Sequence, residues 1–176
     1  MDVSSARDKA RNVRWLVLDV DGVLTDGRII LDGGEGEWKA FDVRDGQRIV
    51  LAAHEGIRTV FLTGRSSRVV ERRASELGVH RVFQRAHDKG EVMDLFFREE
   101  GARPVETAYL GDDIVDLPAL RRAGLAAAVA DAVPEVQAVA DWIAAAPGGH
   151  GAVRELVEFI LVAQGRWESA LARFGR

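Results

Sequence analysis

Short, nearly continuous apolar runs recur along this chain and constrain its fold more than any other feature. They lie at residues 15–18, 59–62, 81–83, 108–110 and 125–129. An uninterrupted apolar run of this length is typical of a strand that is covered on both faces. Segments with helical character lie between the runs, at about 45–55, 66–77, 88–99 and 115–123. Because strands alternate with helices, the sequence predicts a mostly parallel sheet with helices on both faces.

The last predicted helix has the clearest periodicity. Its apolar side chains recur at i, i+3, i+4, i+7 and i+8, which places them on one stripe: Val153, Leu156, Val157, Ile160 and Leu161. The length of 176 residues is that of one ordinary domain. We therefore predict a single domain over residues 1–176, with the α/β architecture of a Rossmann-like three-layer α/β/α sandwich.

One segment breaks the alternation of strands and helices. Residues 28–31 and 37–41 flank a glycine-rich turn at 32–36, a pattern that predicts a protruding β-hairpin over about 28–41. The hairpin directly follows the first predicted strand, so it should project near the carboxyl end of that strand. Open parallel sheets bind their ligands at this edge.

Two acidic clusters each follow an apolar run. Asp19 and Asp21 come directly after the first run, and Asp112, Asp113 and Asp116 follow the fourth. Ionised carboxylates at the end of buried strands need a cation or a proton. If the two strands are parallel neighbours, both clusters meet at one edge of the sheet, where oxygen ligands suit Mg²⁺. Either cluster alone could simply cap a turn or a helix, but the two together favour a metal site.

Two further features can bind a phosphate group. Thr63 and Gly64 end the second run just before a predicted helix, and a hydroxyl beside exposed helix amides forms a phosphate cradle. Lys89 opens a later helix, where the helix dipole does not favour a lysine. Each feature alone is also explained by ordinary turn chemistry or by a solvated surface position.

Composition excludes several classes of function. The net charge of −4 provides no basic excess for a nucleic-acid partner. The absence of cysteine excludes disulfides and thiolate metal sites. Residues 1–12 lack the apolar core of a signal peptide, and no apolar run is long enough to cross a bilayer. We therefore expect a cytoplasmic protein with no nucleic-acid partner and no membrane partner.

These motifs, in this order, resemble the four motifs of the haloacid dehalogenase superfamily. Residues 19–27 resemble its first motif, Thr63 and Gly64 its second, Lys89 its third, and residues 111–116 its fourth. The resemblance implies a phosphatase with Mg²⁺ as its cofactor.

In such an enzyme, Asp19 attacks phosphorus and forms an aspartyl-phosphate. Asp21 gives a proton to the leaving oxygen and then takes one from the hydrolytic water. The residues expected to bind the phosphate oxygens are Thr63, Gly64 and Lys89.

The metal ligands implied by the resemblance are Asp19, Asp112 and the backbone carbonyl of Asp21. Asp113 and Asp116 are expected to support the site, by orienting Lys89 and metal-bound water.

The resemblance extends to a narrower family. Residues 41–46, 63–65, 111–113 and 148–155 are similar to those of 3-deoxy-D-manno-octulosonate 8-phosphate phosphatases, which act in the inner-core sugar pathway of lipopolysaccharide. This similarity implies hydrolysis of that small phosphosugar acid and the absence of a large cap domain. It also implies a homotetramer, in which the hairpin of one subunit covers the active site of its neighbour. The tail at 165–176 either reaches a neighbouring site in the same way or is a frayed terminus.

The resemblance also implies residues that contact the sugar acid. We expect Arg65 and Arg73, eight residues apart on one predicted helical face, to bind a substrate carboxylate, together with Asp45. Arg65 favours the octulosonate type, because 9-phosphatases of the sialic-acid type tend to have an acidic residue there. Gln47 and Arg48 depart from the family pattern, which has an aromatic residue or histidine followed by glycine. The alternatives are a phosphatase for a nonulosonate 9-phosphate and a non-catalytic module that mediates oligomerisation.

Overall fold

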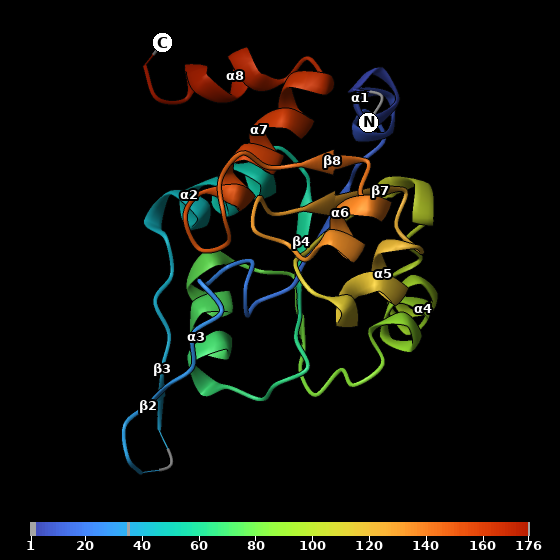
Figure 1. The fold of residues 1–176 in the computed structure, drawn as a ribbon. Helices are drawn as coiled ribbons and strands as arrows, with labels where there is room; N and C mark the ends of the chain where they lie inside the picture. The colour runs from blue at the N-terminus through green and yellow to red at the C-terminus, as the bar shows by residue number, and fades with distance from the viewer. Residues whose placement is uncertain (1–2, 35, 176) are drawn as a thin grey trace.

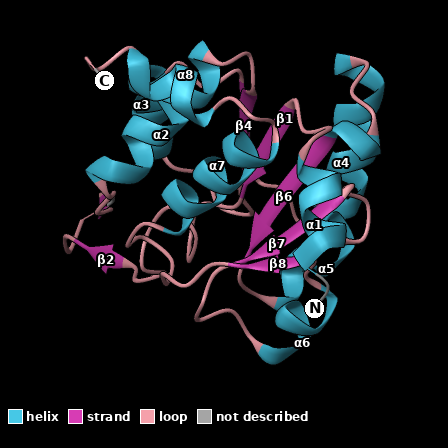
Figure 2. Ribbon diagram, turned by 90° about the horizontal axis from the view of Figure 1, so that it is seen from above, coloured by secondary structure: helices cyan, strands magenta, loops and turns pink. Residues whose placement is uncertain are grey.

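A six-stranded parallel sheet forms the centre of the molecule (Figures 1 and 2). The computed structural model describes residues 3–34 and 36–175. The strands, in their order across the sheet, are β5 (Arg81–Phe83), β4 (Arg58–Leu62), β1 (Trp15–Leu18), β6 (Thr107–Gly111), β7 (Leu125–Ala128) and β8 (Trp142–Ile143). Each neighbouring pair is parallel. The predicted Rossmann-like α/β fold is confirmed.

The register of the central strands sets up the functional edge of the sheet. Leu18, the last residue of β1, pairs with Phe61 of β4 on one side and with Leu110 of β6 on the other. All four residues of β1 are buried, which is why its sequence is continuously apolar. The residues that follow Leu18, Leu62 and Gly111 therefore emerge side by side at the carboxyl edge.

Helices cover both faces of the sheet. Figure 2 shows α2, α3 and α7 on one face and α4 and α5 on the other. The helices are α1 (Val3–Ala10), α2 (Val43–His54), α3 (Arg68–Leu77), α4 (Lys89–Glu100), α5 (Leu117–Leu120), α6 (Pro134–Val139), α7 (Ala152–Ala163) and α8 (Trp167–Ala172), with 3₁₀ turns at Pro104–Glu106 and Ile114–Asp116. The apolar stripe predicted for the last long helix is buried along α7.

The structure also contains elements that the sequence patterns did not predict. Helices α1 and α6 and strand β8 are short, and β8 is a two-residue edge strand whose side chains are only half-buried. The helix expected at 115–123 is instead a 3₁₀ turn followed by the four residues of α5. There, side-chain oxygens of Asp113 and Asp116 accept hydrogen bonds from backbone amides, so a regular helix starts late.

The predicted hairpin projects from the body of the molecule (Figure 1, lower left). Strand β2 (Ile30–Leu31) pairs with β3 (Glu37–Trp38) in antiparallel register. Glu35, in the predicted turn, lies outside the described residues. Between β1 and α2, the described residues form this hairpin and its stalks and no larger cap.

The C-terminal tail forms a helix that packs on its own chain. Arg166 and Arg173, at the two ends of α8, each pair with the buried carboxylate of Glu55 at N···O distances of 3.0 Å and 3.3 Å. Ala170 is fully buried between these contacts. Residues 166–173 are therefore not a frayed end, and their contact with a neighbouring site stays a prediction.

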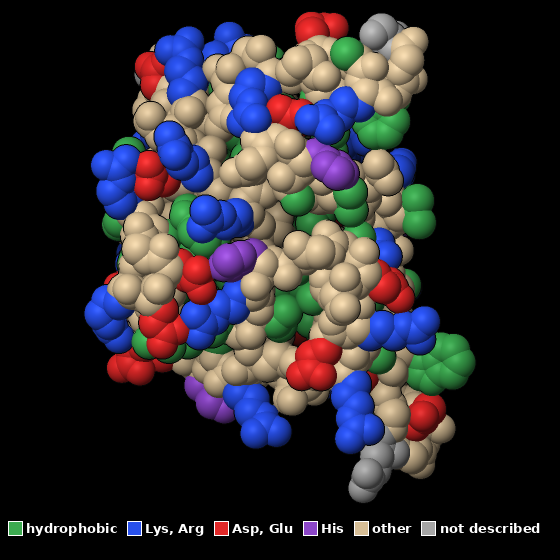
Figure 3. Space-filling model, turned by 180° about the vertical axis from the view of Figure 1, so that it is seen from behind, with side chains coloured by type: hydrophobic (Ala, Val, Ile, Leu, Met, Phe, Trp, Pro, Cys, Tyr) green, Lys and Arg blue, Asp and Glu red, His purple; other side chains and the backbone are tan. Residues whose placement is uncertain are grey.

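Helix hydropathy and surface charge are relevant to membrane and nucleic-acid partners. Among the helices of residues 3–34 and 36–175, none is both long enough and apolar enough to span a membrane. On the face shown in Figure 3, basic and acidic side chains are interspersed.

Candidate active site

The two acidic clusters meet at the carboxyl edge of the sheet. Asp19 follows β1 and donates its backbone N–H to the carbonyl of Leu110 in β6, at 3.1 Å. Carboxylate oxygens of Asp19, Asp112 and Asp116 all lie within 4.8 Å of one another. Asp19 and Asp116 are buried, and Asp112 is half-buried. The parallel pairing of β1 with β6 therefore produces the predicted convergence.

Lys89 binds two of these carboxylates. Its Nζ donates to Oδ1 of Asp19 at 2.7 Å and to Oδ1 of Asp116 at 2.6 Å. Helix α4 begins at Lys89 because the Asp88 side chain caps it, accepting from the amides of Gly90 and Glu91. The lysine is 3% exposed, so a solvated surface position is excluded.

Asp116 holds Lys89 in place. Its Oδ1 also accepts from the hydroxyl of Tyr109 at 2.6 Å, and its Oδ2 accepts from the amides of Asp112 and Asp113 at 3.0 Å and 3.2 Å. Because these donors fill its acceptor positions, Asp116 acts as a support. Sequence reasoning missed Tyr109, although it is the chain's only tyrosine and lies on a buried strand, where its hydroxyl needs a partner.

The electrostatics of the cluster indicate a shortage of positive charge. Burial, together with the neighbouring charges of Asp19 and Asp116, raises the pKa of Asp112 to about 8. Burial and repulsion from Asp116 raise the pKa of Asp19 to about 6, although Lys89 opposes the shift. Burial disfavours the Lys89 ammonium, but Asp19 and Asp116 outweigh this and raise its pKa. One ammonium does not neutralise three carboxylates.

The residues at the cluster fit a hard divalent cation. Oδ1 of Asp112 is buried and has no hydrogen-bond partner among the described residues, as expected for an oxygen available to a metal. Gly22 makes room for this carboxylate, since a Cβ at that position would lie 2.1 Å from its Oδ2. Asp19 and Asp112 offer oxygen ligands of the kind that Mg²⁺ prefers.

A cavity of about 270 Å³ adjoins the cluster and brings most of the predicted site together. It is lined by residues that include Asp19, Asp21, Thr63, Gly64, Arg65, Lys89, Asp112 and Asp113. Thr63 donates its hydroxyl to Oδ2 of Asp21 at 3.3 Å and accepts from the amide of Arg65 at 3.2 Å. A larger cavity, of about 670 Å³, is lined by Arg11, Arg14, Arg103 and Arg166, all of which pair with carboxylates.

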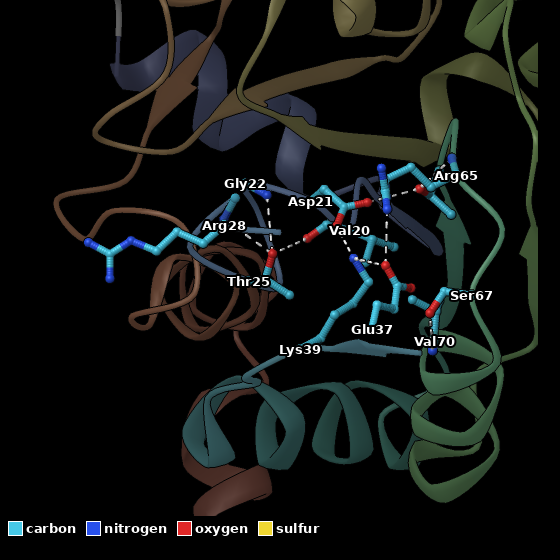
Figure 4. A network of polar contacts seen from close by, with 12 residues as sticks. Val20, Asp21, Gly22, Thr25, Arg28, Glu37, Lys39, Arg65, Ser67 and Val70 are labelled. Atoms are coloured by element: carbon cyan, nitrogen blue, oxygen red, sulfur yellow. Dashed lines mark hydrogen bonds and ion pairs between the residues drawn. The ribbon is translucent and has the colours of Figure 1, made fainter. Parts of the chain in front are cut away.

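The hairpin adds a contact that the sequence did not predict. Lys39, just after β3, places its Nζ on Oδ1 of Asp21 (Figure 4). Its neighbour Glu37 accepts from Nη2 of Arg65 at 3.1 Å. The sequence feature that could have indicated this contact is the presence of a lysine in a hairpin that follows the first acidic cluster.

The glycine-rich segment at 148–151 packs on the loop that follows Asp21. The amide of Gly149 donates to the carbonyl of Val23 at 2.9 Å. A Cβ at Gly148 would lie 1.7 Å from the carbonyl oxygen of Gly22, so only glycine allows this approach. The segment thus supports the loop that carries the first acidic cluster.

Two expectations for the sugar contacts are corrected. Asp45 is buried, and its carboxylate accepts from the amides of Gly151 at 3.2 Å and Arg154 at 2.7 Å. It therefore anchors the start of α7 and is not open to a substrate. Arg65 and Arg73 do not share a helical face, because Ser67 caps α3 and the helix begins only at Arg68.

The positions of the remaining predicted sugar residues are clear. Arg65 lines the cavity, whereas the guanidinium of Arg73 lies over the ring of Phe41, 5.7 Å from its centre. Arg48, which departs from the family pattern, bonds Glu158 at 2.9 Å and lies over the Trp167 ring. This departure therefore serves the packing of α2 on α7 and α8.

Comparisons with known proteins agree with this geometry. The family of haloacid dehalogenase-like hydrolases matches residues 37–124. The 3-deoxy-D-manno-octulosonate 8-phosphate phosphatase of Escherichia coli K12 is 41% identical over 162 residues, covering 92% of this chain and 86% of that protein.

Solved structures are similar as well. The enzyme of that name from Moraxella catarrhalis, in complex with magnesium, phosphate and KDO, has a TM-score of 0.95 and 38% identity, with 98% and 99% of the two chains covered. The cobalt-bound enzyme from Haemophilus influenzae has a TM-score of 0.86 and 39% identity, with 90% and 93% covered. The chain belongs to the haloacid dehalogenase-like hydrolases and, within them, to the 3-deoxy-D-manno-octulosonate 8-phosphate phosphatase family.

Proposed function

We propose that this protein is a Mg²⁺-dependent phosphatase that hydrolyses 3-deoxy-D-manno-octulosonate 8-phosphate to the free sugar acid and inorganic phosphate. One observation carries the proposal: carboxylates from two distant segments converge with a buried lysine beside a cavity. The family relationship indicates the substrate, because relatives that are named as phosphatases for this compound align with nearly the whole chain.

Asp19 is the proposed nucleophile. Lys89 holds its Oδ1, which leaves its other carboxylate oxygen for the attack on phosphorus. The bond between phosphorus and the sugar oxygen breaks while the aspartyl-phosphate forms. Asp21 supplies the proton to the leaving oxygen and later accepts one from the water that releases phosphate.

The phosphate oxygens are bound by Thr63, Gly64 and Lys89, which surround the cavity. Asp19, Asp112 and the backbone carbonyl of Asp21 would hold Mg²⁺. When bound, the metal offsets the repulsion between the anionic nucleophile and the anionic phosphate. Asp116 keeps Lys89 in place, and Asp113 caps the turn that follows Asp112.

Arginines are proposed to bind the carboxylate of the sugar acid. Arg65 is at the cavity, and its guanidinium is 41% exposed, within reach of an incoming anion. Arg73 is set further back against Phe41, and its buried Nε has no hydrogen-bond partner among the described residues. Binding of the sugar acid would give both guanidiniums a second anionic partner, in addition to Glu37 for Arg65 and Glu76 for Arg73.

The proposal includes a homotetramer of single-domain subunits in the cytoplasm. The hairpin exposes an apolar surface that consists of Ile29, Ile30, Leu31 and Trp38, each at least 52% exposed. A two-stranded hairpin cannot bury both of its faces by itself. A second copy of the chain would cover this surface and place the hairpin near a neighbouring active site.

The test is phosphate release from a panel of sugar phosphates, with and without a metal chelator. The octulosonate 8-phosphate should be the best substrate, and the chelator should abolish its hydrolysis. Faster hydrolysis of a nonulosonate 9-phosphate would reject the substrate assignment. Activity that survives chelation would reject the metal.

A further inference from the structure

Lys39 is a buried charged residue that none of the roles above uses. It lies just beyond β3 on the stalk of the hairpin, and its side chain is only 1% exposed. Its ammonium contacts Oδ1 of Asp21, as Figure 4 shows. Burial of a lysine costs free energy unless its charge is paired, so Lys39 depends on its contact with Asp21.

The choice of lysine is itself informative. The chain contains three lysines among its 24 Lys and Arg residues. Two of the three, Lys39 and Lys89, are buried on aspartates of the active site. An ammonium is a compact point charge that can sit on one carboxylate oxygen, whereas a guanidinium is a wide planar fork. An otherwise arginine-rich chain therefore has lysine at both places where a buried cation contacts single oxygens of these aspartates.

The carboxylate of Asp21 is held from two sides. Lys39 binds Oδ1 from the hairpin, and the Thr63 hydroxyl binds Oδ2 from the end of β4 at 3.3 Å. The Asp21 side chain remains 19% exposed and lines the cavity. Two contacts at different oxygens fix the plane of the carboxyl group before substrate arrives, which is how a catalytic group is preorganised.

Lys39 is also fixed. Oε2 of Glu37 lies 3.8 Å from its Nζ and accepts from Arg65, so the hairpin stalk is joined to the segment that precedes α3. In Figure 4 the side chains of Glu37, Lys39 and Arg65 converge in one network with Asp21. The hairpin is therefore tied to the chemistry of its own subunit.

We propose that Lys39 is a positioning residue for Asp21, orienting its carboxyl group toward the leaving oxygen. The inference rests on the proposed acid–base role of Asp21. In the step concerned, the bond from phosphorus to the sugar oxygen breaks and a proton passes from Asp21 to that oxygen. Lys39 forms and breaks no bond in this step, and it acts only through the orientation of Asp21.

The test compares two leaving groups in the Lys39→Met variant. The 8-phosphate of the octulosonate leaves as a primary alcohol and needs a proton, whereas p-nitrophenolate leaves without one. Single-turnover release from the sugar phosphate should fall about 10- to 100-fold, part of the usual contribution of general acid catalysis. Release from p-nitrophenyl phosphate should fall less than about threefold. Equal losses on both substrates, or no loss on either, would overturn the proposal.

A double-mutant cycle separates positioning from a purely structural effect. In an Asp21→Asn background, Lys39→Met should cause no further loss on the sugar phosphate, because its target is already gone. A further loss as large as in the wild-type background would contradict the positioning role. Lys9→Met is the matched control, since it removes a lysine paired with Asp141 at 2.5 Å away from the cavity, and it should leave both rates unchanged.

Two outcomes distinguish this inference from the proposed function. If Asp21→Asn retains full release from the sugar phosphate, the role of Asp21 is wrong, and Lys39 has no catalytic group to position. If Asp21→Asn loses release selectively while Lys39→Met does not, only the role of Lys39 is wrong. Should Lys39→Met fail to fold, Lys39→Gln retains a hydrogen-bond donor and should show a smaller but still selective loss.

Discussion

The active site has two sides that are built differently. Around Asp19, the contacts come from strand ends and from the start of a helix. The residues that make them, Lys89, Asp116 and Tyr109, are all buried. Around Asp21, the contacts come from Thr63 and from Lys39 of a projecting hairpin. The proposed nucleophile thus belongs to the buried core of the fold, whereas the proposed acid–base group depends partly on a peripheral element. A change in the hairpin should therefore affect Asp21 more than Asp19.

The strongest test of the core side is removal of the nucleophile. Asp19→Asn should lower kcat by more than about 10⁴-fold, because the variant lacks the carboxylate that is proposed to accept the phosphoryl group. Circular dichroism should show an intact fold, since Lys89 still binds Asp116. A variant that turns over at near wild-type rate would show that Asp19 is not the nucleophile.

Stability should also distinguish the two sides. Asp116→Ala removes a fully buried partner of Lys89 and Tyr109, so the free energy of unfolding should fall by about 3–5 kcal/mol. Glu37→Ala, on the hairpin side, removes a partly exposed pair with Arg65 and should cost only about 0–1 kcal/mol. Urea unfolding measures both, and equal losses would contradict the difference between the two sides.

The pH dependence of metal binding follows from the raised carboxyl pKa values. In the metal-free folded protein, the pKa is about 8 for Asp112 and about 6 for Asp19. The folded state therefore keeps protons on these two carboxyl groups at pH values where the unfolded chain has released them. Their protonation therefore favours folding at low pH, and this contribution is lost as pH rises through about 8. If Asp19 and Asp112 hold the metal, Mg²⁺ replaces these protons, and the stabilisation by Mg²⁺ should grow as pH rises toward 8.

Thermal unfolding at saturating Mg²⁺ and with chelator provides the measurement. The difference in Tm should increase from near zero at about pH 5 to about 2–6 °C at about pH 8. A difference that stays constant over this range would mean that metal and protons do not compete for these carboxylates.

The smallest effect on subunit stability is expected at the outer part of the hairpin. Trp38→Ser should change the free energy of unfolding by less than about 0.5 kcal/mol, since the ring is 67% exposed. Light scattering should nevertheless show a smaller assembly, because the exposed ring would pack against another copy. An unchanged molar mass, or a wild-type protein that is a monomer, would reject the role of the hairpin in assembly.

The sequence predicts the core side better than the hairpin side for a physical reason. The strands β1 and β6 are continuous apolar runs, and parallel pairing brings the aspartates that follow them to one edge. An apolar run can be identified from a few consecutive residues, and parallel pairing places the ends of such strands in a regular way. Short elements such as β8 carry no usable periodicity.

Contacts that depend on tertiary packing could not be predicted from the sequence. Asp45 was expected at the sugar, but its carboxylate binds amides at the start of α7, more than a hundred residues away. The contact of Lys39 with Asp21 likewise depends on the path of the hairpin stalk. Side-chain orientation in irregular segments is decided by packing that no sequence period encodes.

The most direct test of the central claim is calorimetric titration with Mg²⁺. Wild-type protein should bind one Mg²⁺ per chain, and Asp112→Asn should bind it at least about 10-fold more weakly. Asp94→Asn, which alters an exposed carboxylate paired with Arg122, should bind as the wild type does. If Asp112→Asn retained wild-type affinity, the two acidic clusters would not form the metal site.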